Sequence, residues 1–184
     1  MSNILIIENI LIVAHDAGGA EIVSSYVRQN PSNGYQYLLD GPAVNIFQKK
    51  LGNIKINQTH DESFVKGFDS IITGQSWASD LEKKIIQAAK RAGIKVVTFV
   101  DHWVGYTEGF KYQDKITLPN EIWLGDVEAL EIAKKEFPND ILRLIENPYF
   151  IDINKSLNEY KVKKTRISKT RILYVCEPLM EHSI

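Results

Sequence analysis

The chain has 184 residues, of which 44% are hydrophobic and 24% are charged. This length suits one domain with a sizeable core, and it leaves room for a fragment of a second domain. The 22 basic and 23 acidic residues give a net charge of −1 at pH 7, which argues against a dedicated nucleic-acid-binding protein. The single cysteine, Cys176, excludes an internal disulfide and any site with several cysteine ligands. We therefore expect a protein of a reducing compartment, the cytoplasm.

The apolar start of the chain differs from a secretory signal and from a membrane span. No lysine or arginine precedes Arg28, and Glu8 and Asn9 interrupt the apolar run. A signal peptide carries a basic segment before its apolar stretch, and a membrane helix needs roughly 20 apolar residues. Ile10–Ala14 therefore fits a strand that is buried on both faces, and we expect no transmembrane segment in the rest of the chain.

Short β-branched segments alternate with longer amphipathic segments along the first 150 residues. Strands are expected at Ile10–Ala14, Tyr35–Leu39, Ile54–Ile56, Ser70–Thr73, Lys95–Val100, Glu121–Leu124 and Ile141–Ile145. Helices are expected at Ala20–Gln29, Ala43–Leu51, from Ser79 or Asp80 to Ala92, and at Val127–Phe137, with residues 57–67 as a loop. Strands that alternate with crossover helices pair in parallel, so the pattern predicts a doubly wound, mostly parallel, Rossmann-like α/β domain over residues 1–150.

The carboxy-terminal part differs in composition. Residues 151–170 are polar and lysine-rich, which predicts a basic linker with a helix from Ile153 to Tyr160. Arg171–Cys176 is a new apolar segment typical of a strand. Two interpretations remain open for residues 171–184: the start of a truncated second domain, or a last strand of the main sheet.

Ligands of doubly wound sheets bind at the carboxyl ends of the strands, and the first polar cluster follows the first strand. Gly18 and Gly19 would let a ligand approach backbone N–H groups at a helix amino terminus, which favours an anionic group. The segment is neither G-x-G-x-x-G nor a Walker loop. His15 and Asp16 are each candidates for a general base. The alternative is a tight turn in which Asp16 caps the helix.

The second cluster follows the strand Ser70–Thr73. Hydroxyl, amide and indole groups of this kind bind sugar hydroxyls or stack on a sugar ring. Ser76 is not within G-x-S-x-G, so the nucleophile of a hydrolase is unsupported. Helix capping is an equally good explanation for Ser76 and Ser79. The candidate ligand-binding residues are Thr73, Gly74, Gln75, Ser76 and Trp77.

The third cluster, Asp101–Phe110, follows the strand Lys95–Val100. Asp101 is suited to orient His102, which would give a proton donor or acceptor near neutral pH. Trp103, Tyr106 and Glu108 are candidates for ligand contacts. The alternative for the aromatic residues is that they pack the loop against the domain.

A divalent metal ion is a further alternative, because two histidines and two aspartates from the first and third clusters could converge. The chain has no H-E-x-x-H spacing, so we expect no metal site. His60 and His182 lie in polar or terminal segments and receive no role.

With these features, the chain resembles the amino-terminal domain of GT-B-type glycosyltransferases and of the related sugar-nucleotide 2-epimerases and hydrolases. The resemblance rests on the loop His15–Gly19, the Asn-Pro turn Glu146–Tyr149, and the segment Arg171–Pro178 after the linker. It implies that the first domain holds the acceptor, with the catalytic base at Asp16 or His15. It also implies that a second domain holds the sugar nucleotide, that no metal or other cofactor is needed, and that these residues alone are inactive.

The leading hypothesis is therefore the acceptor-side domain of a glycosyltransferase in polysaccharide or glycan biosynthesis. Its partners would be a sugar nucleotide and a glycan acceptor, without nucleic acid, and a homo-oligomer is compatible with the sequence. The near alternative is a sugar-nucleotide epimerase or hydrolase. From another class, a non-catalytic small-molecule-binding or assembly domain would make the clusters structural. A flavodoxin-like or NAD-binding domain is disfavoured by the missing glycine fingerprint.

Overall fold

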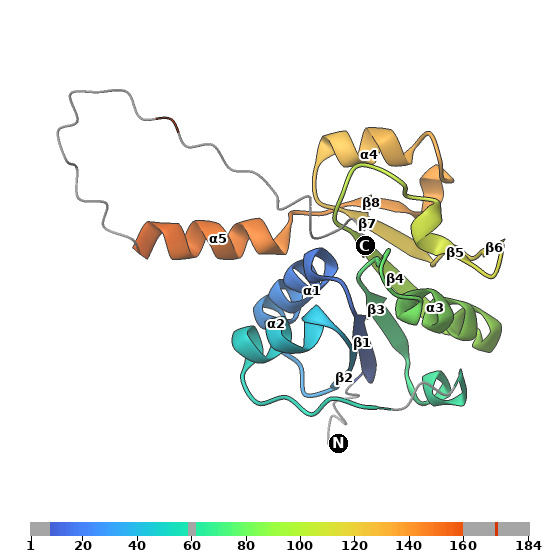
Figure 1. Cartoon of the computed structure of the whole chain (residues 1–184), viewed down its shortest axis with the longest axis horizontal. Helices are drawn as coiled ribbons and strands as arrows, with labels where there is room; N and C mark the ends of the chain where they lie inside the picture. The colour runs from blue at the N-terminus through green and yellow to red at the C-terminus, as the bar shows by residue number, and fades with distance from the viewer. Residues whose placement is uncertain (1–7, 59–61, 160–171, 173–184) are drawn as a thin grey trace, which may run out of the picture.

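The computed structural model of the chain describes residues 8–58, 62–159 and 172, and it contains a six-stranded parallel sheet (Figure 1). Across the sheet, the strands are β2 (Tyr35–Leu39), β1 (Ile10–Ala14), β3 (Ser70–Thr73), β4 (Lys95–Val100), β7 (Glu121–Leu124) and β8 (Leu142–Leu144). Every neighbouring pair in this order is parallel. The doubly wound, Rossmann-like α/β fold expected from the sequence is confirmed.

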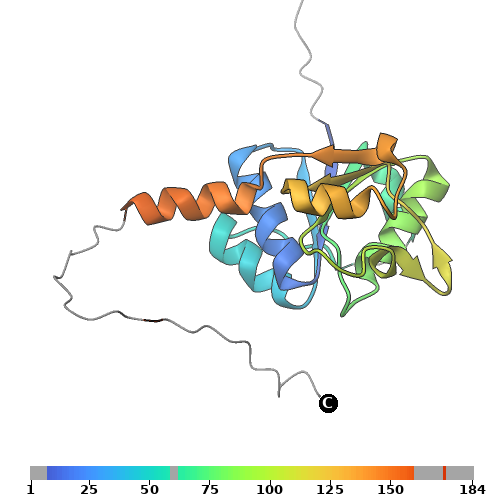
Figure 2. The same ribbon diagram turned by 90° about the horizontal axis from the view of Figure 1, so that it is seen from above.

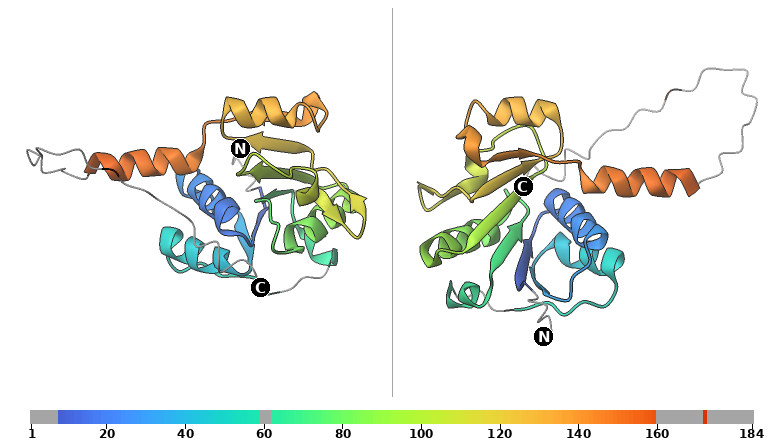
Figure 3. Two further views of the ribbon diagram at one scale, coloured as in Figure 1. Left: turned by 45° about the horizontal axis from the view of Figure 1, so that its top comes forward. Right: turned by 180° about the vertical axis from the view of Figure 1, so that it is seen from behind.

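Helices α1 (Ala17–Gln29) and α2 (Pro42–Leu51) cover one face of the sheet, and α3 (Leu81–Ala92) and α4 (Val127–Ala133) cover the other (Figures 2 and 3). Helix α5 (Pro148–Glu159) packs against α1 and extends beyond the sheet. Because side chains alternate along a strand, Ile12 and Ala14 of β1 pack with α1 and α2, while Leu11 and Val13 pack with α3. All four of these side chains are fully buried. The sheet therefore has two hydrophobic cores, one on each of its faces.

The winding direction of the sheet reverses between β1 and β3. On one side the chain runs outward from β1 to β2 and to Ile56, which forms a parallel bridge with Tyr37. On the other side it runs through β3, β4, β7 and β8. The expected strand Ile54–Ile56 is thus reduced to one bridge, since only Ile56 and the N–H of Asn57 reach Tyr37. A reversal of this kind opens a crevice at the carboxyl ends of β1 and β3.

Several expected boundaries differ from the structure. Residues 57–67 were expected as loop but include the 3₁₀ helix η1 (Glu62–Gly67). Helix α4 ends at Ala133 and not at Phe137, because the N–H groups of Lys135 and Glu136 bond three residues back and tighten the turn. The other unexpected elements are two short 3₁₀ helices and a hairpin: η2 (Glu108–Phe110), η3 (Asn139–Ile141), β5 (Lys111–Tyr112) and β6 (Lys115–Ile116).

Helix α5 crosses residue 150, where the α/β domain was expected to end. Its first turns are tied to α1, since the Gln29 amide nitrogen donates to the Pro148 carbonyl (2.8 Å) and to Asp152 (2.9 Å). Arg28 forms an ion pair with Asp152 at 2.6 Å. The helix expected from Ile153 therefore begins at Pro148.

The rest of the expected linker and of segment 171–184, apart from Ile172, lies outside the described residues. None of the helices in the described part of the chain is long and apolar enough to cross a membrane.

Candidate functional site

The loops after β1, β3 and β4 meet at the reversal point and form one crevice. Its cavity has a volume of about 530 Å³ and is lined by Asp16, Gly18, Gln75, Trp77, Asp101, His102 and Val104. Each of the three sequence clusters contributes to this lining. The parallel winding thus brings Asp16, Asp101 and His102 to one crevice, as expected, whereas Ser76 does not line it, and the roles of these residues remain predictions.

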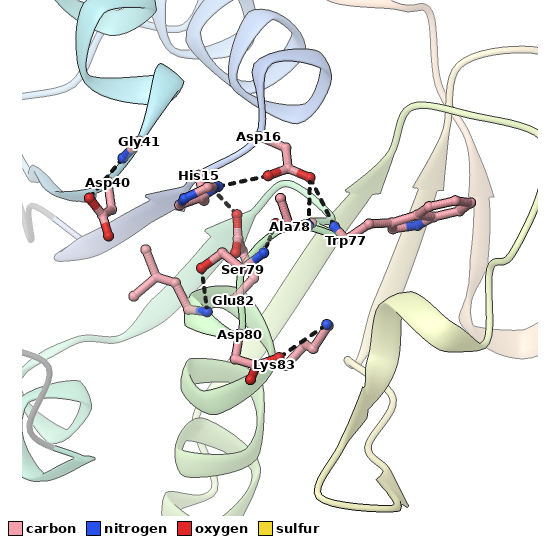
Figure 4. A network of polar contacts seen from close by, with 12 residues as sticks. His15, Asp16, Asp40, Gly41, Trp77, Ala78, Ser79, Asp80, Glu82 and Lys83 are labelled. Carbon is pink, nitrogen blue, oxygen red and sulfur yellow. Dashed lines mark hydrogen bonds and ion pairs between the residues drawn. The ribbon is translucent and has the colours of Figure 1, made fainter. Parts of the chain in front are cut away.

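Asp16 joins the loop after β1 to the loop after β3 (Figure 4). One carboxylate oxygen lies 2.7 Å from His15 Nδ1, and the other accepts the N–H groups of Trp77 (2.9 Å) and Ala78 (3.3 Å). Burial is the largest influence on the pKa of Asp16 and raises it. The hydrogen bonds from His15, Ser76 and the two backbone groups together outweigh burial and hold the pKa below its usual value. Asp16 is the N-cap residue of α1, yet its side chain makes no capping bond.

His15 lies behind Asp16 and in contact with a second carboxyl group. The backbone N–H of His15 donates to Glu82 Oε1 at 2.7 Å (Figure 4). The His15 ring packs on Gly41, where a Cβ atom would lie 2.6 Å from Nε2. His15 does not line the cavity, so it reaches the crevice only through its contact with Asp16.

Glu82 is a site residue that the sequence interpretation missed. Its side chain is only 1% exposed, and its second oxygen is buried without a partner among the described residues. Burial is the main cause that raises the pKa of Glu82, to about 7, and the nearby Asp16 charge adds to it. An acidic residue in the first turn of a helix is ordinarily explained by the helix dipole. The sequence alone therefore does not mark Glu82 as a site residue. Its place becomes visible only from the packing of α3 against the loop after β1.

Asp101 and His102 form an adjacent hydrogen-bonded pair, with 2.8 Å between Asp101 Oδ1 and His102 Nδ1. The other ring nitrogen, Nε2, is buried and has no partner in the described part of the chain. Trp77 covers the His102 ring edge-on at a centroid distance of 4.9 Å, and Tyr106 lies on it at 5.9 Å. Asp101 therefore fixes the orientation of the imidazole through Nδ1.

The glycines of the first cluster have two different roles. A Cβ atom at Gly18 would lie 1.7 Å from Asp101 Oδ2, so glycine is required for Asp101 to lie over the start of α1. A Cβ atom at Gly19 would lie 3.0 Å from the Cα atom of Gly74. Gly19 and Gly74 are thus explained by close packing of α1 on the end of β3, whereas Gly18 forms part of the crevice wall.

The second cluster reaches the cavity through Gln75 and Trp77. Thr73 is buried within the sheet, where its hydroxyl bonds Thr98 at 2.8 Å. The buried Ser76 hydroxyl accepts the N–H of Ser79 at 3.0 Å, in the turn before the N-cap residue Asp80 of α3, so it stabilises this turn and is not itself a cap of the helix.

Packing, the alternative given for the aromatic residues of the third cluster, explains Tyr106. This side chain is fully buried and stacks on Phe137, and burial raises its pKa to about 12. Trp103 is exposed and donates to Asp126 at 3.2 Å. Glu108 is exposed in η2. None of the three candidates Trp103, Tyr106 and Glu108 lines the crevice.

A second cavity of about 300 Å³ lies on the other side of Gly18 and Asp101. Its lining is Ala17, Gly18, Glu21, Ile22, Asp101, Asn147, Tyr149 and Phe150. The Asn-Pro turn Glu146–Tyr149 was noted in the sequence only as a likeness to a family, and it supplies two of these side chains, Asn147 and Tyr149. Because Gly18 and Asp101 border both cavities, the two form adjoining parts of one site. No three His, Cys, Asp or Glu side chains within the described ranges are grouped as metal ligands.

Comparisons with known proteins bear on the fold. No protein-family model matches the chain, and no curated protein matches it in sequence. Solved structures similar to it include UDP-GlcNAc 2-epimerase from Neisseria meningitidis bound to UDP-GlcNAc, and S. aureus MnaA with UDP. The first has a TM-score of 0.57 and 11% identity over 83% of this chain, and the second has 0.55 and 10% over 85%. This chain spans about half the length of each, 50%. The likeness establishes the fold, a GT-B-like Rossmann-type domain.

Proposed function

We propose that the chain is the sugar-binding, acceptor-side domain of an enzyme that acts on nucleotide-activated sugars. The observation that carries the proposal is the crevice at the reversal point, where the Asp101–His102 pair lies beside the indole of Trp77. Carboxylates bind sugar hydroxyls, an indole packs against the apolar face of a sugar ring, and the imidazole supplies proton transfer. The fold likeness to structures that contain UDP-GlcNAc and UDP supports the same class of ligand.

In this proposal His102 is the general base or acid of the site. Asp101 occupies Nδ1 and orients the ring, so Nε2 exchanges the proton with the reacting hydroxyl. Asp16 was the first candidate for this role, but both of its oxygens already accept hydrogen bonds and its pKa is lowered. A carboxylate so stabilised in its charged form is a weak base. Asp16 is therefore assigned to holding the crevice together.

Two reactions fit this arrangement. In a glycosyltransferase of polysaccharide or glycan biosynthesis, His102 would take the proton of the acceptor hydroxyl. In a sugar-nucleotide epimerase or hydrolase, it would act on the donor sugar or on water. The fold likeness to a UDP-GlcNAc 2-epimerase is compatible with the second candidate, and the resemblance of the loop sequences covers both. In either case, a further domain would hold the nucleotide.

Binding can be tested on this chain with paired tryptophan variants. Trp77 and Trp103 are exposed to a similar degree, 54% and 57%, but only Trp77 lines the crevice. Titration with a monosaccharide should change the tryptophan fluorescence of the wild type and of Trp103→Phe, and the change should be lost in Trp77→Phe. UDP alone should give no change. A sugar response that persists in Trp77→Phe would contradict the proposed site.

Activity is tested on the protein expressed from its complete gene, with UDP-sugars in the presence and absence of a glycan acceptor. UDP release that depends on the acceptor identifies a transferase, and reaction without acceptor identifies an epimerase or hydrolase. Loss of a general base costs about 10²- to 10⁴-fold in rate, which is the expected effect of His102→Ala. A fully active His102→Ala protein would contradict the assigned role.

A further inference from the structure

We infer that the crevice recognises a ring that bears an amine, such as an amino sugar, and disfavours a phosphorylated one. This inference deepens the proposed sugar-binding function and rests on it. It follows from the polar atoms and charges that line the two adjoining cavities.

The first observation is an unpartnered acceptor on Gln75. This side chain is 2% exposed and lines the larger cavity, with its Nε2 donating to the carbonyl of Tyr106 at 3.0 Å. That bond fixes the orientation of the amide, because a flipped amide would place two oxygens against each other. Oε1 is then a buried acceptor with no partner among the described residues. A ligand that donates a hydrogen bond would satisfy it.

The second observation is the charge of the lining. Asp16 and Asp101 border the larger cavity, and Asp101 also borders the smaller one, where the Glu21 carboxylate is already paired with Lys50. Among the described residues that line the two cavities, none is a lysine or an arginine. A phosphate group would meet carboxylates here without a fixed cation, whereas an ammonium group would meet acceptors.

Lys50 is a cation near the smaller cavity although it does not line it. Its Nζ atom is 5.3 Å from the ring centre of Tyr149, which is a lining residue. Nζ donates to the Glu21 carbonyl (2.9 Å), to the Glu21 carboxylate (2.6 Å) and to the Ser25 hydroxyl (2.8 Å). An ammonium group has three protons, so these bonds occupy all of them. Lys50 therefore links α2 to α1 and has no proton left to donate to a phosphate group.

The amino terminus of α1 would by itself favour an anion. In this chain Asp101 already lies against it, because Asp101 Oδ2 occupies the place that a Cβ atom of Gly18 would take. The positive end of the helix thus has an anionic group of the protein beside it. The exposed indole of Trp77 adds a further surface that attracts cations.

The inference is tested on the chain by titration with glucosamine, glucose and glucose 6-phosphate at pH 6.5 and low ionic strength, followed by NMR. Glucosamine should bind about tenfold more tightly than glucose, the difference between a charge-assisted and a neutral hydrogen bond. Glucose 6-phosphate should bind more weakly than glucose. Asp101→Asn should reduce the preference for glucosamine, and so should Gln75→Leu.

The matched control is Asp114→Asn, which makes the same change in charge at a side chain that is 96% exposed in the β5–β6 turn. It should leave all three affinities unchanged. Equal affinities for glucose and glucosamine, or tightest binding of the phosphate, would overturn the inference while sugar binding stands. Failure of all three sugars to bind would overturn the proposed function itself.

Discussion

Two carboxyl groups beside His15, those of Asp16 and Glu82, have pKa values that are shifted in opposite directions. Asp16 accepts hydrogen bonds at both oxygens, and its pKa is lowered. Glu82 has one oxygen bonded to the His15 N–H and the other buried without a partner among the described residues, and its pKa is raised. Deep burial raises the pKa of Glu82, whereas at the more exposed Asp16 the hydrogen bonds to the charged form outweigh burial.

Replacement of Asp16 should loosen the crevice more than it changes the rest of the protein. Asp16→Ala removes the acceptor of the Trp77 and Ala78 N–H groups. We expect a loss of about 1–2 kcal/mol in the free energy of unfolding, measured by urea denaturation, because water can reach these groups in part. Since its folded pKa is lowered, the contribution of Asp16 is present above the unfolded value of 3.8 and disappears as the pH falls through the folded pKa. Asp114→Ala, at an exposed turn, should change the stability little.

Glu82 should make the stability of the protein fall as the pH rises. Its folded pKa of about 7 lies above the unfolded value of 4.5, so the folded protein binds more protons between these values. The cost at higher pH approaches roughly 3 kcal/mol at 1.36 kcal/mol per pKa unit. Glu82→Gln keeps an acceptor for the His15 N–H and should be more stable than the wild type above pH 7.

The contrasting control for Glu82→Gln is Glu121→Gln. Hydrogen bonds from Trp123 and Lys95 hold the pKa of Glu121 below its usual value. This substitution should therefore reduce stability at neutral pH, and the difference from the wild type should vanish in acid. A wild-type stability that is independent of pH between 4.5 and 7 would contradict the role of Glu82.

At the residue level, the sequence predicted the positions that end a strand better than those that depend on tertiary packing. Asp16, Gln75 and Asp101 come within two residues of the end of a buried strand, so the parallel topology places them at one edge. Tyr106 lies farther along its loop, where the direction of the side chain depends on Phe137 from another element. Glu82 depends likewise on how α3 meets the loop after β1.

At the scale of elements, the contact between α1 and β4 depends on Gly18. Alanine in a helix is ordinarily more stable than glycine by about 1 kcal/mol. At Gly18 the new methyl group would overlap the Asp101 carboxylate, so Gly18→Ala should lower stability and shift the His102 and Trp77 NMR signals. Gly67→Ala is the control, because a Cβ atom there has no neighbour within 4 Å. A Gly18→Ala protein that is stabilised, with unchanged His102 signals, would contradict this contact.

The bounds of β1, β2, β3, β4 and β7 were predicted as the structure has them. For β1, β3 and β4 the reason is that strands buried on both faces are short, largely apolar runs. The β5–β6 hairpin was missed because its turn residues, Gln113 and Asp114, take positive φ values of 48° and 58° without the glycine that marks such turns.

At the scale of the molecule, the attachment of α5 depends on a buried carboxylate. Asp152 is 6% exposed and binds Arg28 and Gln29 of α1. Asp152→Ala should release α5, so that hydrogen exchange of the α5 amides becomes fast while the amides of β1 and β3 stay protected. Asn154→Ala, on the exposed side of the same helix, should change neither. Continued protection of α5 in Asp152→Ala would show that its apolar contacts suffice.

The position of β1, with a partner strand on each side, has a consequence for the synthesis of the protein. When β1 and β2 have left the ribosome, the second edge of β1 still has unpaired N–H and C=O groups, and its Leu11 and Val13 lack the cover of α3. At about 5–20 residues per second, the nascent chain spends seconds in this half-paired state before Ser70–Thr73 emerges. Chaperone binding to ribosome-bound chains should therefore be strongest before β3 emerges and should decline once α3 has followed it.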